Sequence, residues 1–354
     1  MSEARDHLEA IAAAPRPAGG DAEKSARDYC ARVLRAAGFD VSERAFEYST
    51  FVGRWGTPLF GVGIALLALA AACEGASGSA SRALGILIGG ALALSGIGSW
   101  LGRRGVLDLP FARARSTNLV ATRGAPSLWL VAHLDSKSQP IPIVARALAI
   151  IASMIFLGVV MGVAVAQLVV PIPGFVWFTL ATISVLFALP VMASIVGARS
   201  PGALDDASGL ATVLRAVELL PRDIGIGVVL TSAEELGLAG ARAWAREAPH
   251  ATAINVDGID DTGDVRLIYS GRLPRSLVAL LGAAWPSPVK LVPGVLMDGV
   301  ALQQAGWEVV NISKGGWRAV SRIHTPGDDL AHLSGSGAEA VAAMLAGAIA
   351  ASPR

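Results

Sequence analysis

Charged residues are scarce in this 354-residue chain, where they make up 16% against the roughly 25% of an average soluble domain. The shortage is concentrated in three windows without any Asp, Glu, Lys or Arg, namely residues 55–73, 83–102 and 147–198. These windows hold 91 residues, so the other 263 carry 22% charge, close to an ordinary globular composition. This distribution argues against a purely soluble, a disordered or a collagen-like chain.

Cysteine and net charge are also low. Cys30 and Cys73 are too few for a disulfide framework and lack zinc-finger spacing. The net charge of +1 gives no indication of nucleic-acid binding. A cleavable signal peptide is not expected, because the first apolar stretch begins only after more than fifty residues of charged sequence.

The uncharged windows have the length of membrane-spanning helices, which need about 20 apolar residues. The third window is long enough for two spans, with a turn at Pro171–Gly174. For the short first window, a buried soluble helix is the alternative. We predict four transmembrane helices in two hairpins, near residues 57–73, 83–101, 147–170 and 174–197.

Positive charge is distributed unevenly on the two sides of these spans. Residues 1–54 carry eight Lys and Arg and residues 103–146 carry seven, whereas the two short outer loops carry only Arg82. Because Lys and Arg near spans favour the cytoplasmic side, the polar part of this integral membrane protein is predicted to be cytoplasmic. The basic residues that flank the spans directly are Arg103, Arg104, Arg146 and Arg199.

Small residues at helical spacing predict close packing between spans. The pairs Gly85/Gly89 and Gly158/Gly162 each have the Gly-x-x-x-Gly spacing that lets helix backbones approach. The alternative is that glycine, with 40 copies, is simply common in this chain.

The polar segments alternate between strand-like and helix-like patterns, which predicts an α/β fold with a mixed, mostly parallel sheet sandwiched by helices. Residues 1–54, 103–143 and 199–354 together are expected to form one domain. Residues 55–102 and 144–198 are its two inserted hairpins. The predicted strands are 39–48, 117–122, 127–133, 224–231, 251–256, 265–270 and 309–313, and the predicted helices are 3–37 (broken at 15–20), 209–220, 238–247, 274–284 and 337–350.

Metal-binding side chains recur where the predicted strands end. In open α/β sheets, sites form beyond the carboxyl ends of the strands, so these segments are expected to meet in one crevice. Each alone is weak, because an acidic pair before a helix can be an N-cap and a Glu-Glu pair can be surface. The five segments are His133–Asp135, Asp205–Asp206, Glu234–Glu235, Asp257 and His324–Asp328.

The donor set of such a crevice indicates its chemistry. Two histidines and three carboxylates suit a borderline metal such as zinc. Five ligands with one shared carboxylate can hold two metals and leave positions open for water. A further carboxylate is then needed to move the proton of that water, and the Glu234–Glu235 pair can divide the two tasks.

The chain resembles the di-zinc aminopeptidase family of clan MH metallopeptidases, which also contains glutamate carboxypeptidases and glutaminyl cyclases. The resemblance rests on the five segments, in order and spacing, and on Pro15–Gly19, Thr117–Ala121 and Asp298 before Gly306. It covers nearly all of the polar sequence, and only the two apolar hairpins are foreign to the basic fold.

The resemblance implies a role for each motif residue. His133 and Asp257 would bind one zinc ion, Glu235 and His324 the other, and Asp205 would bridge the two.

The same resemblance makes Glu234 the general base and then the general acid. Asp135 would orient the ring of the first histidine ligand, and Asp328 would buttress the loop of the second. Two positions depart from the family pattern. Ile323 stands where a tyrosine is common, so an oxyanion-stabilising phenol is missing, and Asp206 stands where asparagine is frequent.

These observations predict a membrane-anchored di-zinc metallopeptidase, most simply an aminopeptidase acting on peptides. The alternatives are a glutaminyl-cyclase-like aminoacyl transferase and a non-catalytic receptor or assembly subunit on the same fold. A transporter is not supported, because the spans contain no ionisable residue. The expected partners are peptide substrates and the lipid bilayer, with no nucleic acid.

The second hairpin lies between His133 and Asp205 in the sequence. We therefore expect the crevice to lie close to the membrane surface and the substrates to include hydrophobic or membrane-associated peptides. The alternative is that the hairpins only anchor the domain.

Overall fold

The computed structural model describes residues 3–292 and 294–352. The chain divides into two compact units. The first is made of Met1–Thr50, Val106–Ser138 and Ala198–Arg354, and the second of Phe51–Gly105 and Gln139–Gly197. The second unit therefore interrupts the sequence of the first twice.

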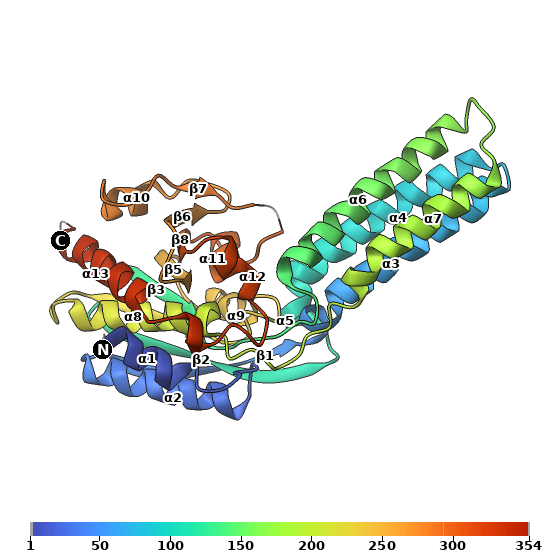
Figure 1. Ribbon diagram of the computed structural model, residues 1–354. Helices are drawn as coiled ribbons and strands as arrows, with labels where there is room; N and C mark the ends of the chain where they lie inside the picture. The colour runs from blue at the N-terminus through green and yellow to red at the C-terminus, as the bar shows by residue number, and fades with distance from the viewer. Residues whose placement is uncertain (1–2, 293, 353–354) are drawn as a thin grey trace. The chain divides into compact units, whose positions relative to one another are not determined.

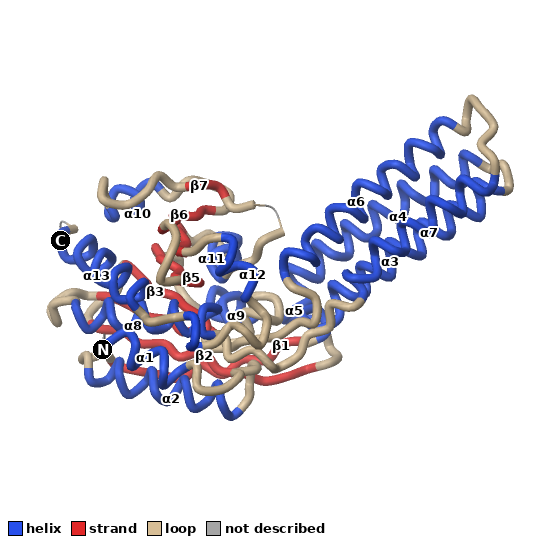
Figure 2. The backbone as a smooth tube through the Cα atoms, in the orientation of Figure 1, coloured by secondary structure: helices blue, strands red, loops and turns tan. Residues whose placement is uncertain are grey.

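An eight-stranded sheet forms the centre of the first unit, in the order β1-β2-β4-β3-β5-β8-β6-β7 (Figure 2). In its middle, β3 lies parallel to both β4 and β5, and β5 lies parallel to β8. The pairs β1/β2, β2/β4 and β6/β8 are antiparallel. The strands are β1 (Asp40–Ser49), β2 (Arg113–Arg123), β3 (Leu128–His133), β4 (Ile226–Thr231), β5 (Thr252–Ile259), β6 (Val265–Tyr269), β7 (Val289–Lys290) and β8 (Glu308–Lys314).

Helices cover both faces of this sheet because its central strands are apolar on both sides (Figure 1). In β3, Leu130 and Ala132 belong to the core shared with α1, α2, α8 and α13, while Val131 belongs to the core shared with α9 and α11. This is the period-two alternation of a strand. The helices are α1 (Glu3–Ile11), α2 (Asp21–Ala36), α5 (Val106–Asp108), α8 (Ser208–Leu219), α9 (Ala239–Glu247), α10 (Arg275–Leu281), α11 (Asp298–Gln304), α12 (Trp317–Arg322) and α13 (Ser336–Ala351).

The α/β fold predicted from the sequence, with a mixed and mostly parallel sheet between helices, is confirmed. The elements absent from the prediction are short: β7 has two residues, α5 three, α12 six and α11 seven. A helix of one or two turns shows too few positions for a 3.6-residue period to stand out from the sequence.

The second unit consists of four long helices. These are α3 (Phe51–Ala76), α4 (Ala80–Trp100), α6 (Ile143–Ala166) and α7 (Gly174–Met192), and each is long and apolar enough to cross a membrane. The predicted spans overlap these helices, but α6 begins at Ile143 and takes Arg146 into its first turn. A long arginine side chain can place its charge at the interface from such a position.

Close helix packing in this unit uses other glycines than the predicted ones. At Gly85, Gly89, Gly158 and Gly162 an added Cβ atom meets nothing within 4 Å among the described residues, so the predicted packing faces are wrong. The contacts lie elsewhere. A Cβ on Gly75 would come within 2.2 Å of the Trp177 ring, and similar close approaches pair Gly90 with Leu67, Gly63 with Leu94 and Gly61 with Met192.

Candidate metal centre

Three neighbouring parallel strands bring the predicted site residues to one edge of the sheet. His133 is the last residue of β3, and Glu234–Glu235 follow the end of β4. Asp257 lies near the carboxyl end of β5. Asp205 lies in the turn that precedes α8, and His324 follows α12. Because β4, β3 and β5 run in the same direction, their carboxyl ends meet at this edge.

Five side chains form two groups that share one carboxylate. The first group is His133, Asp205 and Asp257, and the second is Asp205, Glu235 and His324. Within each group the ligand atoms lie within 4.8 Å of one another. The two oxygens of Asp205 face different histidines: His133 Nε2 is 3.0 Å from Oδ1, and His324 Nε2 is 3.1 Å from Oδ2.

The cluster contains more buried carboxylate oxygens than hydrogen-bond donors, which favours a bound metal ion. Glu235 Oε1 is buried and has no hydrogen-bond partner among the described residues, although it lies 3.1 Å from His324 Nε2. Burial raises the pKa of Asp257 to about 7, and the negative charge of Asp205 adds to the effect. A buried set of carboxylates with few donors needs a cation, and a His/Asp/Glu donor set suits zinc.

The two glutamates after β4 have opposite pKa shifts. Burial raises the pKa of Glu234 well above its usual range, assisted by the charges of Glu235 and Asp298. The pKa of Glu235 is lowered in spite of burial, because His324 and Lys137 stabilise its charge. Glu234 belongs to neither ligand group. A carboxyl with a raised pKa beside a metal cluster suits general acid–base work.

The carboxylate of Asp135 is hydrogen-bonded to the backbone of this glutamate pair. Its Oδ1 accepts a hydrogen bond from the backbone N–H of Glu234 at 3.0 Å, and its Oδ2 accepts one from that of Glu235 at 3.2 Å. The sequence predicts that Asp135 orients the ring of His133. His133 Nδ1 lies 3.0 Å from the main-chain carbonyl oxygen of Asp135 and 3.7 Å from its Oδ1, so both the backbone and the carboxylate of Asp135 face this ring. The Asp135 carboxylate therefore links the His133 ring to the backbone of Glu234 and Glu235.

Two further aspartates fix backbone around the cluster. Asp328, predicted to support the His324 loop, accepts from the N–H groups of Leu204 at 2.6 Å and Asp205 at 3.2 Å. Asp206, which has no predicted role, is fully buried and accepts from the N–H groups of His133, Gly209 and Gly258 at 3.0–3.1 Å. Asp206 therefore joins the ends of β3 and β5 to the start of α8.

Lys137 is a residue of the site that the sequence prediction omits. Its Nζ lies 2.6 Å from Glu235 Oε2. Although burial lowers the pKa of Lys137, the charges of Glu235 and Glu234 raise it overall, so the ammonium keeps its charge. The sequence contains a signal that could have identified Lys137. In an extended segment every second side chain points to the same side, so Lys137 lies on the same side as His133 and Asp135.

Asp298 is a further buried carboxylate whose charge raises the pKa of Glu234. It is 1% exposed, accepts a hydrogen bond from the Thr231 hydroxyl, and leaves Oδ1 without a partner among the described residues. Burial raises its pKa to about 6. The sequence singles out Asp298 only through the family resemblance, because nothing local distinguishes it from a helix-capping residue.

Backbone strain accompanies two of these segments. Ala233, which precedes the glutamate pair, has φ of 56°, and His324 has φ of 64°. Such left-handed conformations are unfavourable for side chains with a Cβ and cluster at functional sites. Ile323, where the family resemblance leads us to expect a tyrosine, packs against the apolar core.

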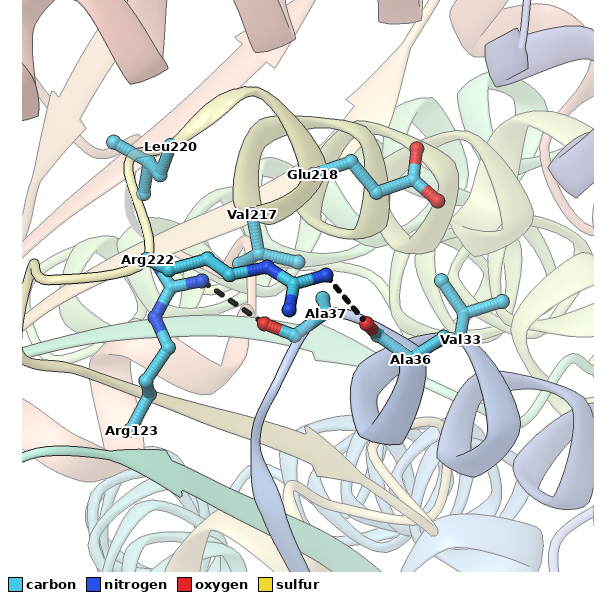
Figure 3. Close-up of a pocket in the computed structure, with 8 residues that line it drawn as sticks. All are labelled: Val33, Ala36, Ala37, Arg123, Val217, Glu218, Leu220 and Arg222. Atoms are coloured by element: carbon cyan, nitrogen blue, oxygen red, sulfur yellow. Dashed lines mark hydrogen bonds between the residues drawn. The ribbon is translucent and has the colours of Figure 1, made fainter.

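A separate cavity of about 280 Å³ lies away from these residues (Figure 3). Its lining includes Arg123 and Arg222, which donate to the carbonyl oxygens of Ala37 and Ala36 at the end of α2. These arginines are engaged with helix-end carbonyls. The cavity contains none of the metal-cluster side chains.

The family model for "Peptidase family M28" matches residues 118–349 of this chain. No curated protein matches the sequence.

Solved structures share the fold at low sequence identity. An aminopeptidase from Aneurinibacillus sp. strain AM-1 is 14% identical with a TM-score of 0.56, covering 98% of this chain and 92% of its own. A glutaminyl cyclase from Fimbriiglobus ruber is 15% identical with a TM-score of 0.55, covering 99% and 95%. A zinc aminopeptidase from Bacillus subtilis is 15% identical with a TM-score of 0.53, covering 98% and 93%.

Proposed function

The chain belongs to peptidase family M28 and is a peptidase-type hydrolase, and on that premise we propose that it is a membrane-anchored di-zinc aminopeptidase. One observation carries the proposal. Two groups of ligand atoms share Asp205, whose two oxygens face different histidines. That arrangement suits a pair of metal ions bridged by one carboxylate.

The ligand assignment follows from the two groups. His133 and Asp257 would hold one zinc ion, and Glu235 and His324 the other, with Asp205 between them. Zinc bound in such a pair polarises the scissile carbonyl and lowers the pKa of a bound water. The donor set of two histidines and three carboxylates fits zinc at both positions.

Glu234 is the residue that moves the proton. Its raised pKa allows it to accept a proton from the attacking water and to donate that proton to the leaving amine nitrogen. Asp135 holds the backbone N–H groups of Glu234 and Glu235, so the base and the neighbouring ligand keep a fixed spacing. Lys137 supplies a positive charge beside Glu235 at the edge of the cluster.

The four apolar helices anchor the enzyme in the bilayer in this proposal. We propose that the first unit, which carries the metal cluster and is here called the catalytic unit, faces the cytoplasm, because basic residues flank the helices on its side of the sequence. The chain leaves the catalytic unit after Ser138 and returns at Ala198, between ligands His133 and Asp205. Hydrophobic or membrane-associated peptides are therefore the proposed substrates.

The function is tested with purified full-length protein in detergent. Metal is removed with a chelator and zinc is returned in steps from zero to two equivalents. Hydrolysis of a peptide with a free amino terminus is expected to disappear on removal and to return with zinc. An N-acetylated copy of the same peptide is expected to remain intact, because an aminopeptidase needs the free amine.

A peptide that begins with glutamine separates the related activities, since glutaminyl cyclases share this fold. Release of free glutamine supports the aminopeptidase. Cyclisation of the terminal glutamine without cleavage of a peptide bond would identify a cyclase instead. Zinc binding without turnover of any of these peptides would identify a non-catalytic subunit.

A further inference from the structure

The insertion of residues 139–197 separates two neighbouring segments of the catalytic unit by a long stretch of sequence. The chain leaves this unit through residues 134–138, the exit segment, and returns through residues 199–205, the re-entry segment. The exit segment follows His133, and the re-entry segment ends with Asp205. About sixty residues of another unit separate the two, so the covalent chain does not fix their spacing.

Arg16 bridges the two segments with a fully buried guanidinium. Its Nε donates to the carbonyl oxygen of Leu134 at 2.8 Å in the exit segment. Its Nη2 donates to the carbonyl oxygen of Gly202 at 3.1 Å, and its Nη1 donates to that of Pro201, both in the re-entry segment. Nη1 also contacts the carbonyl oxygen of Ile11 at the end of α1.

The backbone of Arg16 and three serines complete the junction. The N–H of Arg16 donates to Ser136 Oγ at 2.9 Å, and its carbonyl accepts from the N–H of Ser136 at 2.8 Å. Ser136 Oγ donates in turn to the carbonyl oxygen of Ser200 at 2.9 Å. Ser138 Oγ accepts from the N–H of Arg199 at 2.9 Å, and Ser200 Oγ accepts from that of Gly202 at 3.2 Å.

No carboxylate touches this guanidinium among the described residues, and nearby aspartates offset the cost of its burial only in part. Burial lowers the pKa of Arg16, whereas the charges of Asp206, Asp328 and Asp135 oppose that shift. Those three aspartates are the ones that hydrogen-bond the backbone of the metal-ligand segments. Arg16 therefore contacts the backbone of both segments and lies near the aspartates that hold the metal-ligand segments.

We propose that Arg16 is a positioning residue that sets the spacing between the exit and re-entry segments, and thereby between the metal ligands His133 and Asp205. It fixes a spacing that the long connection through residues 139–197 leaves free. The proposal rests on the proposed metal centre. A planar fork of five N–H donors can reach carbonyls on opposite sides, which a lysine ammonium cannot do.

The test uses full-length Arg16→Met and Arg16→Lys in detergent, with zinc affinity measured by competition against a chelating dye. Arg16→Met is expected to weaken zinc binding about 10- to 100-fold, the range for residues that support metal ligands. Arg16→Lys, which keeps the charge but not the fork, is expected to recover only part of this loss. Hydrogen exchange at residues 134–138 and 199–205 is expected to rise in both variants.

The matched control is Arg123→Met. Arg123 is also buried and donates to three backbone carbonyls, those of Ala37, Pro221 and Ile224, but it lies apart from the metal cluster. This control is expected to lower thermal stability and to leave zinc affinity unchanged. Wild-type zinc affinity in folded Arg16→Met would overturn the proposal, as would an equal loss of affinity in the control.

A milder variant keeps the test valid if Arg16→Met does not fold. Ser136→Ala removes the hydroxyl between Arg16 and Ser200 and is expected to weaken zinc binding in the same direction. Unchanged zinc affinity in Ser136→Ala, with Arg16→Met unfolded, also contradicts the proposal. Failure of the wild-type protein to bind zinc would instead contradict the proposed metal centre.

Discussion

Glu234 and Glu235 are adjacent in the chain, and their environments separate them chemically. The side chain of Glu235 faces His324 and Lys137, and these two neighbours lower its pKa in spite of burial. Glu234 lies beside other carboxylates in a buried position, and its pKa rises. Neighbouring carboxyl groups whose pKa values are pushed apart are typical of sites that carry out acid–base chemistry.

Glu234→Gln is expected to lower turnover at least ~100-fold, because glutamine cannot accept and return the proton. Bound zinc is expected to stay at the wild-type level, since Glu234 lies outside both ligand groups. Steady-state hydrolysis and elemental analysis on one preparation measure the two effects. Glu247→Gln, an exposed position on α9, is the control. Near wild-type turnover would refute the role of Glu234.

Glu235→Ala is expected to reduce the zinc content from two ions to one. The substitution removes a ligand of the second group and leaves His133, Asp205 and Asp257 in place. Elemental analysis after extensive dialysis measures the change. Two tightly held ions in this variant would rule out the ligand assignment.

Lys137→Met removes a positive charge beside the cluster without removing any of the proposed metal ligands. Without the ammonium beside Glu235, repulsion of a divalent ion falls, so zinc is expected to bind at least as tightly as in the wild type. Turnover is expected to fall about tenfold or more, because a positive charge that can stabilise the oxyanion is lost and Ile323 offers no phenol. Weaker zinc binding with unchanged turnover would show that Lys137 only supports its neighbour.

At the scale of elements, an ion-pair network joins three helices on one face of the sheet. Arg215 of α8 lies 2.7 Å from Glu339 of α13 and also contacts Glu3 of α1. Within α8 it lies 3.5 Å from Glu218, which pairs with His7 of α1. Partial burial opposes ionisation, but the hydrogen bond from Arg215 lowers the pKa of Glu339. His7 and Arg215 lower that of Glu218 likewise.

Arg215→Met is expected to destabilise the protein at pH 7 by up to about 1 kcal/mol, because these pairs are partly exposed. A carboxylate with a lowered folded-state pKa contributes stability above its unfolded pKa of about 4.3 and loses it as pH falls through the folded value. The difference in thermal midpoint from wild type is therefore expected to shrink below about pH 4. Arg35→Met, an exposed position on α2, is the control. A difference that does not depend on pH would contradict this account.

At the scale of the whole molecule, the two inserted hairpins form one four-helix unit rather than two independent anchors. The apolar cluster of this unit draws on all four helices, with Trp177 of α7 buried against Gly75 of α3. Removal of one hairpin would expose apolar surface on the other, so a deletion experiment should remove both.

A catalytic unit without residues 51–105 and 139–197 is expected to remain folded. Ser138 and Arg199 are hydrogen-bonded neighbours within it, so a linker of about four residues can join its ends there. Zinc binding and cleavage of soluble peptides are expected to persist. Cleavage of peptides held in lipid vesicles is expected to fall relative to full-length protein in the same vesicles. Equal activity of both proteins on both substrates would show that the helices do not affect access of membrane-held peptides to the site.

The sequence by itself determines the long apolar helices, the central strands and the identity of the cluster residues. Long uncharged windows, strand runs such as residues 127–133, and polar residues at strand ends are local patterns, and local patterns can be recognised without coordinates. The short helix α11, which carries Asp298, has no such pattern. The glycine spacing also misleads, since Gly85 and Gly158 follow the packing motif but make no close contact.

Only the tertiary structure decides how these residues act on one another. Asp135 lies about a hundred residues before Glu234 and Glu235 in the sequence, yet its carboxylate accepts hydrogen bonds from the backbone N–H groups of both. Lys137 and Arg16 reach their partners in the same manner. The pKa shifts, the roles proposed for Glu234 and Glu235, and the hydrogen bonds of Arg16 all depend on burial and on long-range contacts, which the fold creates and which no local pattern contains.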